Sequence, residues 1–184
     1  MLCLRIRFYV PTATHFGIFH RKFLILHTES TYITMRLVIQ RVKRASVSID
    51  NEIFSKIGPG LMILVGVENG DTSEDMEWLA KKVAALRIFD DENGVMNRSV
   101  TDAGGSVMAV SQFTLTASTR KGNRPSYIRA AGHDVAVPLY EAFCDRMAEL
   151  TGKEVARGRF GSDMQVELIN DGPVTIIIDS RRKE

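Results

Sequence analysis

A continuous apolar run, Leu61–Val67, constrains the fold of this chain more than any other part of its sequence. A short unbroken run of this kind is typical of a strand that is buried on both faces. Thr72 or Ser73 then stands at a helix-capping position, and Glu74 to Glu77 bring acidic residues to the first turn, where the helix dipole favours them. The apolar residues that follow recur at helical spacing: Met76, Leu79, Ala80, Val83 and Leu86. A buried strand that leads into an amphipathic helix over 72–87 predicts a mixed α/β domain.

Alternating apolar residues upstream of this unit predict a β-hairpin. The first strand runs from Leu37 to Ile49, Asp50-Asn51 supplies the turn, and Glu52–Ile57 returns. Gly58-Pro59-Gly60 then breaks the chain before the buried run. The domain is therefore expected to begin with a strand, a tight turn and a returning strand.

A second strand and a second helix are expected downstream, followed by two more strands. Ser106–Leu115 is the second apolar strand, and Val135–Thr151 is the second helix, with Asp134 as its cap. Met164–Ile169 and Val174–Asp179 alternate as two last strands around a Gly-Pro turn. This order predicts one domain of the α/β (α+β) class, with a strongly curved, mixed, barrel-like sheet and two helices.

The chain divides at Met35, where the first strand pattern begins. Residues 1–34 show no clean period and carry a net charge of 4 − 1 = +3, from Arg5, Arg7, Arg21, Lys22 and Glu29. We interpret 1–34 as an extension that is disordered or has a non-native start, with an organelle transit peptide as the alternative. Residues 35–184 form the domain, and their charge of 20 − 21 = −1 does not point to a nucleic-acid partner.

Several common kinds of catalytic site lack their residues in this domain. It holds one histidine, His133, and one cysteine, Cys144, so Ser-His-Asp and Cys-His hydrolases are not expected. His133 stands at a helix start and is expected to be a solvated neighbour of the cap, whereas Cys144 is expected to be a buried small hydrophobe. Zinc ligands and phosphate-binding glycine motifs are also missing, so we expect no metal and no cofactor. Any chemistry must then come from backbone groups, hydroxyls or the substrate itself.

Three polar segments remain as candidates for a site. Ser111–Leu115 places polar residues at the end of an apolar strand, a usual position for sites in α/β domains. Lys121–Tyr127 is either a basic phosphate-binding loop or a solvated turn. Asn170–Thr175 contains a Gly-Pro pair, which is common in turns, and nothing local argues that its peptide bond is cis.

Taken together, six segments closely resemble the D-aminoacyl-tRNA deacylase family, in order and from 35 to 184. They are Ile39–Val42 with Arg44–Val47, Gly104–Val107, Ser111–Leu115, Arg124–Tyr127, Gly158–Phe160 with Asp163–Val166, and Asn170–Thr175. Three departures are Tyr127 in place of a usual phenylalanine, the pair Gly161-Ser162, and the extension, which has no family counterpart.

The resemblance implies a hydrolase that cleaves the ester between a D-amino acid and the 3′-terminal adenosine of tRNA. It also implies activity on glycine mischarged on alanine tRNA, rejection of L-aminoacyl-tRNA, and assistance from the 2′-hydroxyl of the ribose. The resemblance also implies a homodimer. No stretch of about 18 apolar residues spans a membrane, so a cytoplasmic protein is expected.

The same resemblance assigns the residues of the site. Ser111, Gln112, Phe113 and Thr114 are expected to line the pocket for the terminal adenosine and the ester, with Phe160 and Met164 on the adenosine side. Gly172 and Pro173, joined by a cis peptide bond, are expected to enter the pocket of the partner subunit and select the D isomer. Arg41 is the candidate to hold this segment by hydrogen-bonding nearby carbonyls, the alternative being a surface arginine.

Two rival interpretations stay open. The domain is either an enzyme or a non-catalytic α/β dimer that binds nucleic acid or protein, although a sequence-independent RNA binder is expected to be basic. Alternatively, Thr114 is a covalent nucleophile, which requires a nearby base that the sequence does not reveal.

Overall fold

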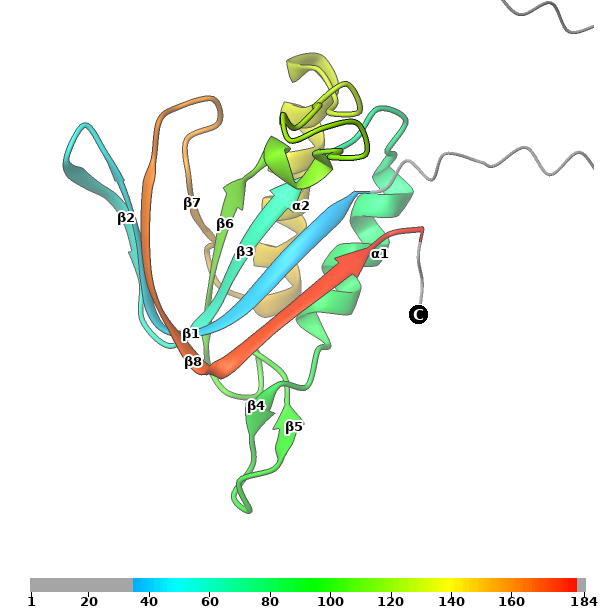
Figure 1. The fold of residues 1–184 in the computed structure, drawn as a ribbon. Coiled ribbons are helices and arrows are strands. Elements are labelled where there is room, and N and C mark those ends of the chain that lie inside the picture. The colour runs from blue at the N-terminus through cyan, green and yellow to red at the C-terminus, as the bar shows by residue number, and fades with distance from the viewer. Residues whose placement is uncertain (1–34, 182–184) are drawn as a thin grey trace, which may run out of the picture. The chain divides into compact units, whose positions relative to one another are not determined.

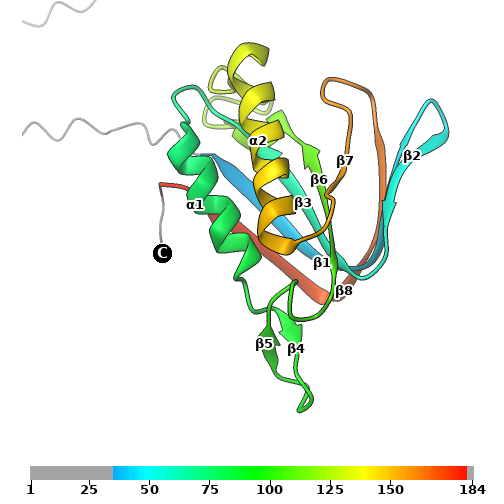
Figure 2. The same ribbon diagram turned by 180° about the vertical axis from the view of Figure 1, so that it is seen from behind.

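Two helices cover one face of a strongly curved, mixed β-sheet (Figures 1 and 2). The computed structural model describes residues 35–181, and the interpretation of 1–34 falls outside these residues. The elements are β1 (Arg36–Ile49), β2 (Glu52–Ile57), β3 (Gly60–Gly66), α1 (Ser73–Ala84), β4 (Phe89–Asp90), β5 (Met96–Arg98), β6 (Ser106–Ser111), η1 (Phe113–Thr116), α2 (His133–Thr151), β7 (Ala156–Arg157) and β8 (Gln165–Asp179). The predicted fold class is confirmed, and among the described residues no helix is long and apolar enough to cross a membrane.

Strand β1 organises the sheet because it changes partners along its length. Its first half pairs with β3 and its second half with β2, while β8 runs antiparallel along the other edge from Arg36 to Ser48. The remaining order is β3-β6-β7, and these strands are parallel. The hairpin prediction is confirmed, with Asp50 and Asn51 at φ values of 54° and 65° in the turn. This exchange of partners curls the sheet so that it nearly closes on itself.

The apolar strands β3 and β6 lie between two hydrophobic clusters. Leu61, Ile63 and Val65 of β3 pack toward the helices, whereas Met62 faces the inside of the curled sheet. Strand β6 alternates in the same way, with Val107 and Ala109 toward the helices, and Met108 and Val110 toward the other cluster. Burial on both faces explains why these strands read as unbroken apolar runs.

Both predicted helices are present, with different ends. Thr72 caps α1 in a capping box with Asp75, but the helix stops at Ala84 instead of continuing to 87. Helix α2 begins at His133, with Gly132 at the cap position, so the prediction that Asp134 is the cap is wrong. Asp134 instead lies in the first turn, where its charge still favours the positive end of the helix dipole.

The second apolar strand is shorter than predicted. Strand β6 ends at Ser111, and Phe113–Thr116 forms the short 3₁₀ helix η1 in place of the expected strand end. The amide of Gln112 still donates to the carbonyl of Val65 over 2.7 Å, so the chain leaves the sheet only after this residue. The polar segment therefore starts in the sheet and turns sharply away from it.

The two expected C-terminal strands are one long strand, β8, and the turn predicted between them is wrong. Both halves of β8 run antiparallel to β1, so the chain does not reverse. Val42 pairs with Asn170 and Gln40 with Thr175, so four residues, Asp171 to Val174, face the single β1 residue between those pairs. Glycine and proline suit such a bulge as well as a turn, because both interrupt the regular ladder.

Candidate active site

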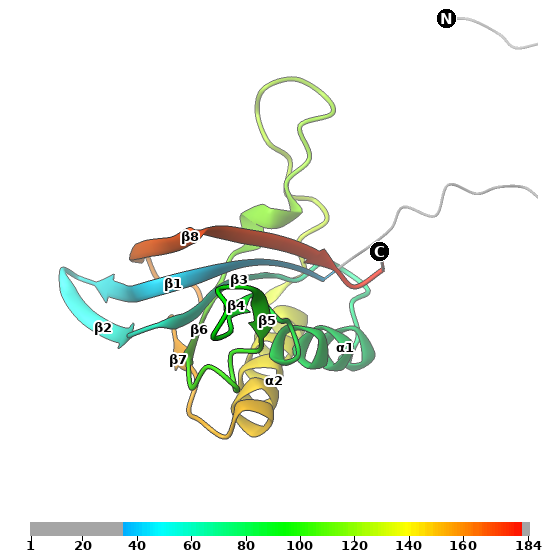
Figure 3. The same cartoon turned by 90° about the horizontal axis from the view of Figure 1, so that it is seen from below.

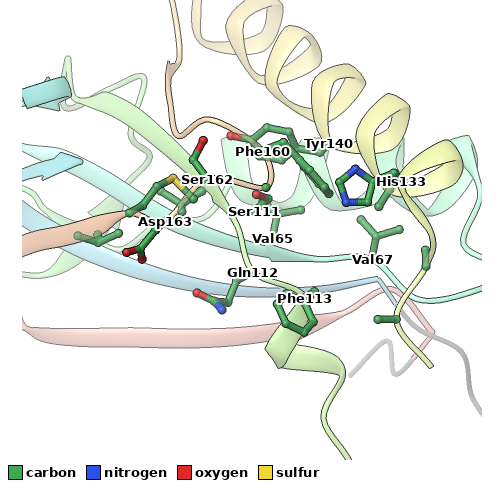
Figure 4. A pocket seen from close by; sticks show the side chains of 17 residues that line it. Val65, Val67, Ser111, Gln112, Phe113, His133, Tyr140, Phe160, Ser162 and Asp163 are labelled. Atoms are coloured by element: carbon green, nitrogen blue, oxygen red, sulfur yellow. The ribbon is translucent and has the colours of Figure 1, made fainter. Parts of the chain in front are cut away.

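A cavity of about 550 Å³ opens where β3 and β6 end (Figure 4). Val65, Val110 and Ser111 from these strands line it together with Val67, which follows β3, and Phe113, the first residue of η1. The start of α2 and the segment from Phe160 to Met164 form the rest of its wall. The lining is mainly apolar and aromatic with a few polar groups, which is typical of a site for a small organic group.

Five of the predicted site residues line this cavity: Ser111, Gln112, Phe113, Phe160 and Met164. Two glycines let the backbone come close enough to form it. A Cβ at Gly66 would lie 2.9 Å from Cβ of Leu115 and 3.2 Å from the carbonyl oxygen of Gln112. A Cβ at Gly158 would lie 2.7 Å from the sulfur of Met164. Phe113 is 56% exposed, so its ring forms an apolar wall that is accessible to a ligand.

Thr114 lies beside the cavity and is not among the residues that line it. Its hydroxyl oxygen accepts a hydrogen bond of 2.6 Å from the side-chain amide of Gln112. An amide nitrogen donates and cannot remove a proton, so this contact does not activate Thr114 as a nucleophile. The bond instead fixes the orientation of the Gln112 side chain, which does line the cavity.

The cavity also contains residues that the sequence analysis did not assign to a site: His133, Tyr140, Ser162 and Asp163. His133 is exposed at the start of α2, as predicted, but its ring meets Phe160 edge-on at a centroid distance of 5.1 Å (Figure 4). The sequence carried one signal for it, since it is the domain's only histidine. Its approach to Phe160 depends on how α2 packs, which no local pattern shows.

The buried phenol and thiol near the cavity are poor acid–base or nucleophilic groups. Tyr140 donates to the carbonyl of Ala109 over 2.9 Å, and burial raises the pKa of its phenol well above the ordinary value. Burial likewise raises the pKa of the Cys144 thiol to about 12, so it remains protonated at neutral pH. The prediction that Cys144 is a buried hydrophobe is confirmed.

Gly172 and Pro173 lie in the bulge of β8 and do not line the cavity, and the peptide bond between them is cis. Both residues are exposed. The side-chain amide of Asn170 donates through Nδ2 to the carbonyls of Arg41 and Val174 over 3.0 and 2.9 Å, which closes the base of the bulge. The segment is therefore an exposed backbone loop with a fixed base.

Arg41 is the β1 residue opposite this bulge, and it is 7% exposed. Its Nε lies 3.4 Å from the carbonyl oxygen of Asp171 and 3.3 Å from the Asp171 carboxylate. Its Nη1 donates to the carbonyl of Ile88 over 2.7 Å and to Asp90 over 3.2 Å. The arginine thus connects the bulge to Ile88, which precedes β4, and to Asp90 within β4. It is buried, so it is not the surface arginine that the sequence left as an alternative.

Among residues 35–181, no group of three or more His, Cys, Asp or Glu side chains is arranged to hold a metal ion.

Known sequences match most of this chain. The family model for D-Tyr-tRNA(Tyr) deacylase matches residues 38–179. A D-aminoacyl-tRNA deacylase from Parabacteroides distasonis is 65% identical over 150 residues, which cover 82% of this chain and 100% of that relative. A relative of the same name from Akkermansia muciniphila is 60% identical over 150 residues, with the same coverage of 82% and 100%.

Solved structures show the same fold. A protein described as c-Myc DNA unwinding element binding protein has a TM-score of 0.74 and 38% identity, covering 78% of this chain and 97% of that one. A probable eukaryotic D-amino acid tRNA deacylase has a TM-score of 0.69 over 79% of this chain and 99% of that one, and its 18% identity supports the fold alone. With a family model that spans residues 38–179 and relatives matched over their whole length, this chain belongs to the D-Tyr-tRNA(Tyr) deacylase family.

Proposed function

We propose that this protein hydrolyses the ester between a D-amino acid and the 3′-terminal adenosine of tRNA, releasing the free D-amino acid and the tRNA. The observation that carries this proposal is 65% identity over the full length of a relative named D-aminoacyl-tRNA deacylase. Aminoacyl-tRNA is made and used in the cytoplasm, which is therefore the proposed location. Glycine mischarged on alanine tRNA is a proposed second substrate, because glycine has no side chain for a chiral site to exclude.

In this proposal the cavity receives the terminal adenosine and the ester. Phe113, Phe160 and Met164 supply apolar surface for the base and ribose, and the polar groups of Ser111 and Gln112 orient the ester. The ester is already activated for hydrolysis, so positioning it and placing donors where negative charge develops contributes much of the rate. The adjacent 2′-hydroxyl of the ribose assists the attack by water.

The chemistry of the described residues supports assistance by the substrate over a protein nucleophile. Cys144 remains a neutral thiol, the Tyr140 phenol is committed to a backbone carbonyl, and Thr114 accepts from an amide. Each of these groups therefore lacks the activation that covalent catalysis requires. The 2′-hydroxyl is present in every substrate molecule at a fixed distance from the ester.

Selection of the D isomer is proposed to come from Gly172 and Pro173 of the partner subunit in a homodimer. D and L substrates carry the same functional groups, so discrimination requires a surface that cannot yield to the wrong side chain. Backbone held by Arg41 and Asn170 meets this requirement better than a flexible side chain. The exposure of this loop, together with 64% exposure of Ile177 on the same strand, supports a partner at β8.

The direct test compares hydrolysis of D-tyrosyl-tRNA with that of L-tyrosyl-tRNA by the purified full chain. We expect the ratio of kcat/KM values to exceed about 1,000 in favour of the D ester. A steric clash that destabilises the transition state of the L ester by about 4 kcal/mol corresponds to that factor. Alanine tRNA that is mischarged with glycine should be cleaved as well. Equal hydrolysis of both tyrosyl esters would overturn the proposed selection of the D isomer. Failure to hydrolyse either ester would overturn the proposed deacylase activity.

Non-catalytic nucleic-acid binding remains the rival, and one observation favours it: the 38% identity to a protein described as binding a DNA unwinding element. The formal charge of −1 over residues 35–184 argues against strong sequence-independent binding by the domain as a whole. The same hydrolysis assay separates the two, since a pure binding protein leaves the ester intact.

Residues 1–34 are proposed to be dispensable, leaving 35–184 as the functional domain. The family model begins at residue 38, and relatives are matched from end to end by 150 residues. Deleting 1–34 is expected to change kcat/KM for D-tyrosyl-tRNA by less than about twofold and the Tm by less than about 2 °C, because the deletion removes no family-matched residue. Thermal unfolding and kinetics of the two forms check this, and a fall of about 10 °C would contradict it.

A further inference from the structure

The loop between η1 and α2, residues 117–129, starts and ends at the wall of the cavity. Phe113 precedes it, Ala130 follows it, and both line the cavity. Ser118 and Ser126 exchange two backbone hydrogen bonds of 2.9 Å, and the amide of Asn69 donates to the carbonyl of Arg129 over 2.9 Å. Beyond this fixed base the loop stands away from the rest of the domain (yellow-green in Figure 3). We call residues 117–129 the basic loop.

The basic loop carries four positive charges and no negative one: Arg120, Lys121, Arg124 and Arg129. Nη2 of Arg129 forms an ion pair with Glu68 at 3.5 Å and donates a hydrogen bond to the carbonyl of Thr116 over 3.0 Å. The other three are exposed, and within residues 35–181 they form no ion pair. Because residues 35–184 together have a charge of −1, this excess of positive charge is local to the loop.

Exposed aromatic and apolar groups accompany these charges. Tyr127 is 39% exposed, and its ring meets Phe113 edge-on at a centroid distance of 5.0 Å. Ile128 beside it is 84% exposed. Positive side chains next to exposed aromatic rings are typical of surfaces that bind single-stranded nucleic acid, where the cations follow the phosphates and the rings stack on bases.

We propose that the basic loop binds the phosphates of the tRNA acceptor end as this strand leaves the cavity. The inference rests on the proposed function, which places the terminal adenosine in the cavity that the loop flanks. The nucleotides before that adenosine must then pass along the cavity wall beside the loop, where Arg120, Lys121 and Arg124 are exposed and form no ion pair within residues 35–181. Since these side chains lie outside the cavity lining, they increase the affinity for tRNA and leave the chemistry of the ester to the cavity.

The test replaces the three cations together, as Arg120→Gln, Lys121→Gln and Arg124→Gln. Each lost phosphate contact lowers the slope of log K against log salt by about 0.7 to 0.9, so the slope for uncharged tRNA should fall by about 2. The Kd for tRNA at about 0.1 M salt should rise at least about tenfold, with a similar rise in KM for D-tyrosyl-tRNA. Hydrolysis of 3′-O-(D-tyrosyl)adenosine, which has no phosphate, should change by less than about twofold.

A matched control makes the same change of charge elsewhere, as Lys56→Gln, Lys82→Gln and Arg87→Gln. These side chains are exposed and do not line the cavity, so the control should bind tRNA nearly as the unaltered protein does. An equal loss in the control would overturn the proposal, because net charge would then account for binding. So would an equal loss of affinity for a blunt DNA duplex, since the loop would then be a general phosphate binder.

Failure of this proposal is distinguishable from failure of the proposed function. Binding of uncharged tRNA is measured without any hydrolysis, so a loop-dependent salt slope supports the loop even if no ester is cleaved. Suppose the unaltered protein cleaves D-tyrosyl-tRNA and the loop variant keeps the same KM and the same slope of log K against log salt. The proposed deacylase activity is then supported and the loop proposal is overturned.

Discussion

A Gly172→Ala variant is expected to lose at least about 100-fold in kcat/KM for D-tyrosyl-tRNA, which corresponds to about 2.7 kcal/mol of transition-state stabilisation. Gly172 has a φ of +117°, a backbone conformation that residues with a Cβ rarely adopt. The added Cβ would lie 2.8 Å from a methyl of Val174 and 3.2 Å from Nη2 of Arg41. The bulge must therefore shift away from the arginine that holds it, and the backbone surface proposed to position the D ester and to exclude L substrates shifts with it.

A matched glycine separates this effect from general backbone strain. Gly94 has a φ of +74° and nothing within 4 Å of an added Cβ, so Gly94→Ala also places a Cβ at a positive φ, but outside the bulge and without a clash. We expect Gly94→Ala to lower the Tm by a few degrees and to keep both activity and D/L selectivity. If Gly172→Ala retains full activity and selectivity, the chiral role of this segment is wrong.

Mixed dimers test whether the segment acts in the partner's site. Subunits with Gly172→Ala keep an intact cavity, whereas subunits with Phe113→Ala keep an intact Gly-Pro segment. If each segment serves the partner, a mixed dimer contains one complete site and recovers about half of the native activity per dimer. If each segment serves its own subunit, the mixed dimer has no complete site and stays inactive.

The sequence predicted the parts of this fold that depend on near neighbours. The hairpin at Asp50-Asn51 and the cap at Thr72 or Ser73 are set by residues within a few positions of one another; the hairpin is confirmed, and the cap is Thr72. The start of α2 was misplaced by two residues because Asp134 favours a helix N-terminus both as a cap and in the first turn. Local chemistry thus identifies an element and leaves its ends uncertain.

The parts that were missed depend on contacts between distant residues. Glycine and proline near 172 fit a turn and a bulge equally, and only the pairing of both halves of β8 with β1 decides between them. His133 and Asp163 come to the cavity because α2 and the segment after Phe160 pack over the end of β6, and no period in the sequence records that packing. The resemblance supplied Ser111 to Phe113 and Arg41, whose contacts the structure now describes.

Replacing the terminal adenosine of the substrate by 2′-deoxyadenosine is expected to lower kcat by about 10² to 10⁴, the usual contribution of a positioned acid–base group. In the proposed mechanism the 2′-hydroxyl assists the attack by water, and neither the Cys144 thiol nor the Thr114 hydroxyl is activated to replace it. The protein is unchanged in this experiment, so folding and the shape of the cavity cannot account for a loss. The affinity for the deoxy substrate, measured by competition, should stay within about tenfold of the native one.

A Thr114→Ala variant should lose much less, about fivefold, because it removes one hydrogen bond to Gln112 worth about 1 kcal/mol. Thr114→Ser is the matched control, since it keeps the hydroxyl and is expected to restore most of that loss. If Thr114 were the nucleophile, its removal would cost several orders of magnitude, and the deoxy substrate would be cleaved at a nearly normal rate. The relative size of the two losses therefore decides between the mechanisms. If removing the 2′-hydroxyl of the substrate lowers the rate more than Thr114→Ala does, the assisting group is on the RNA.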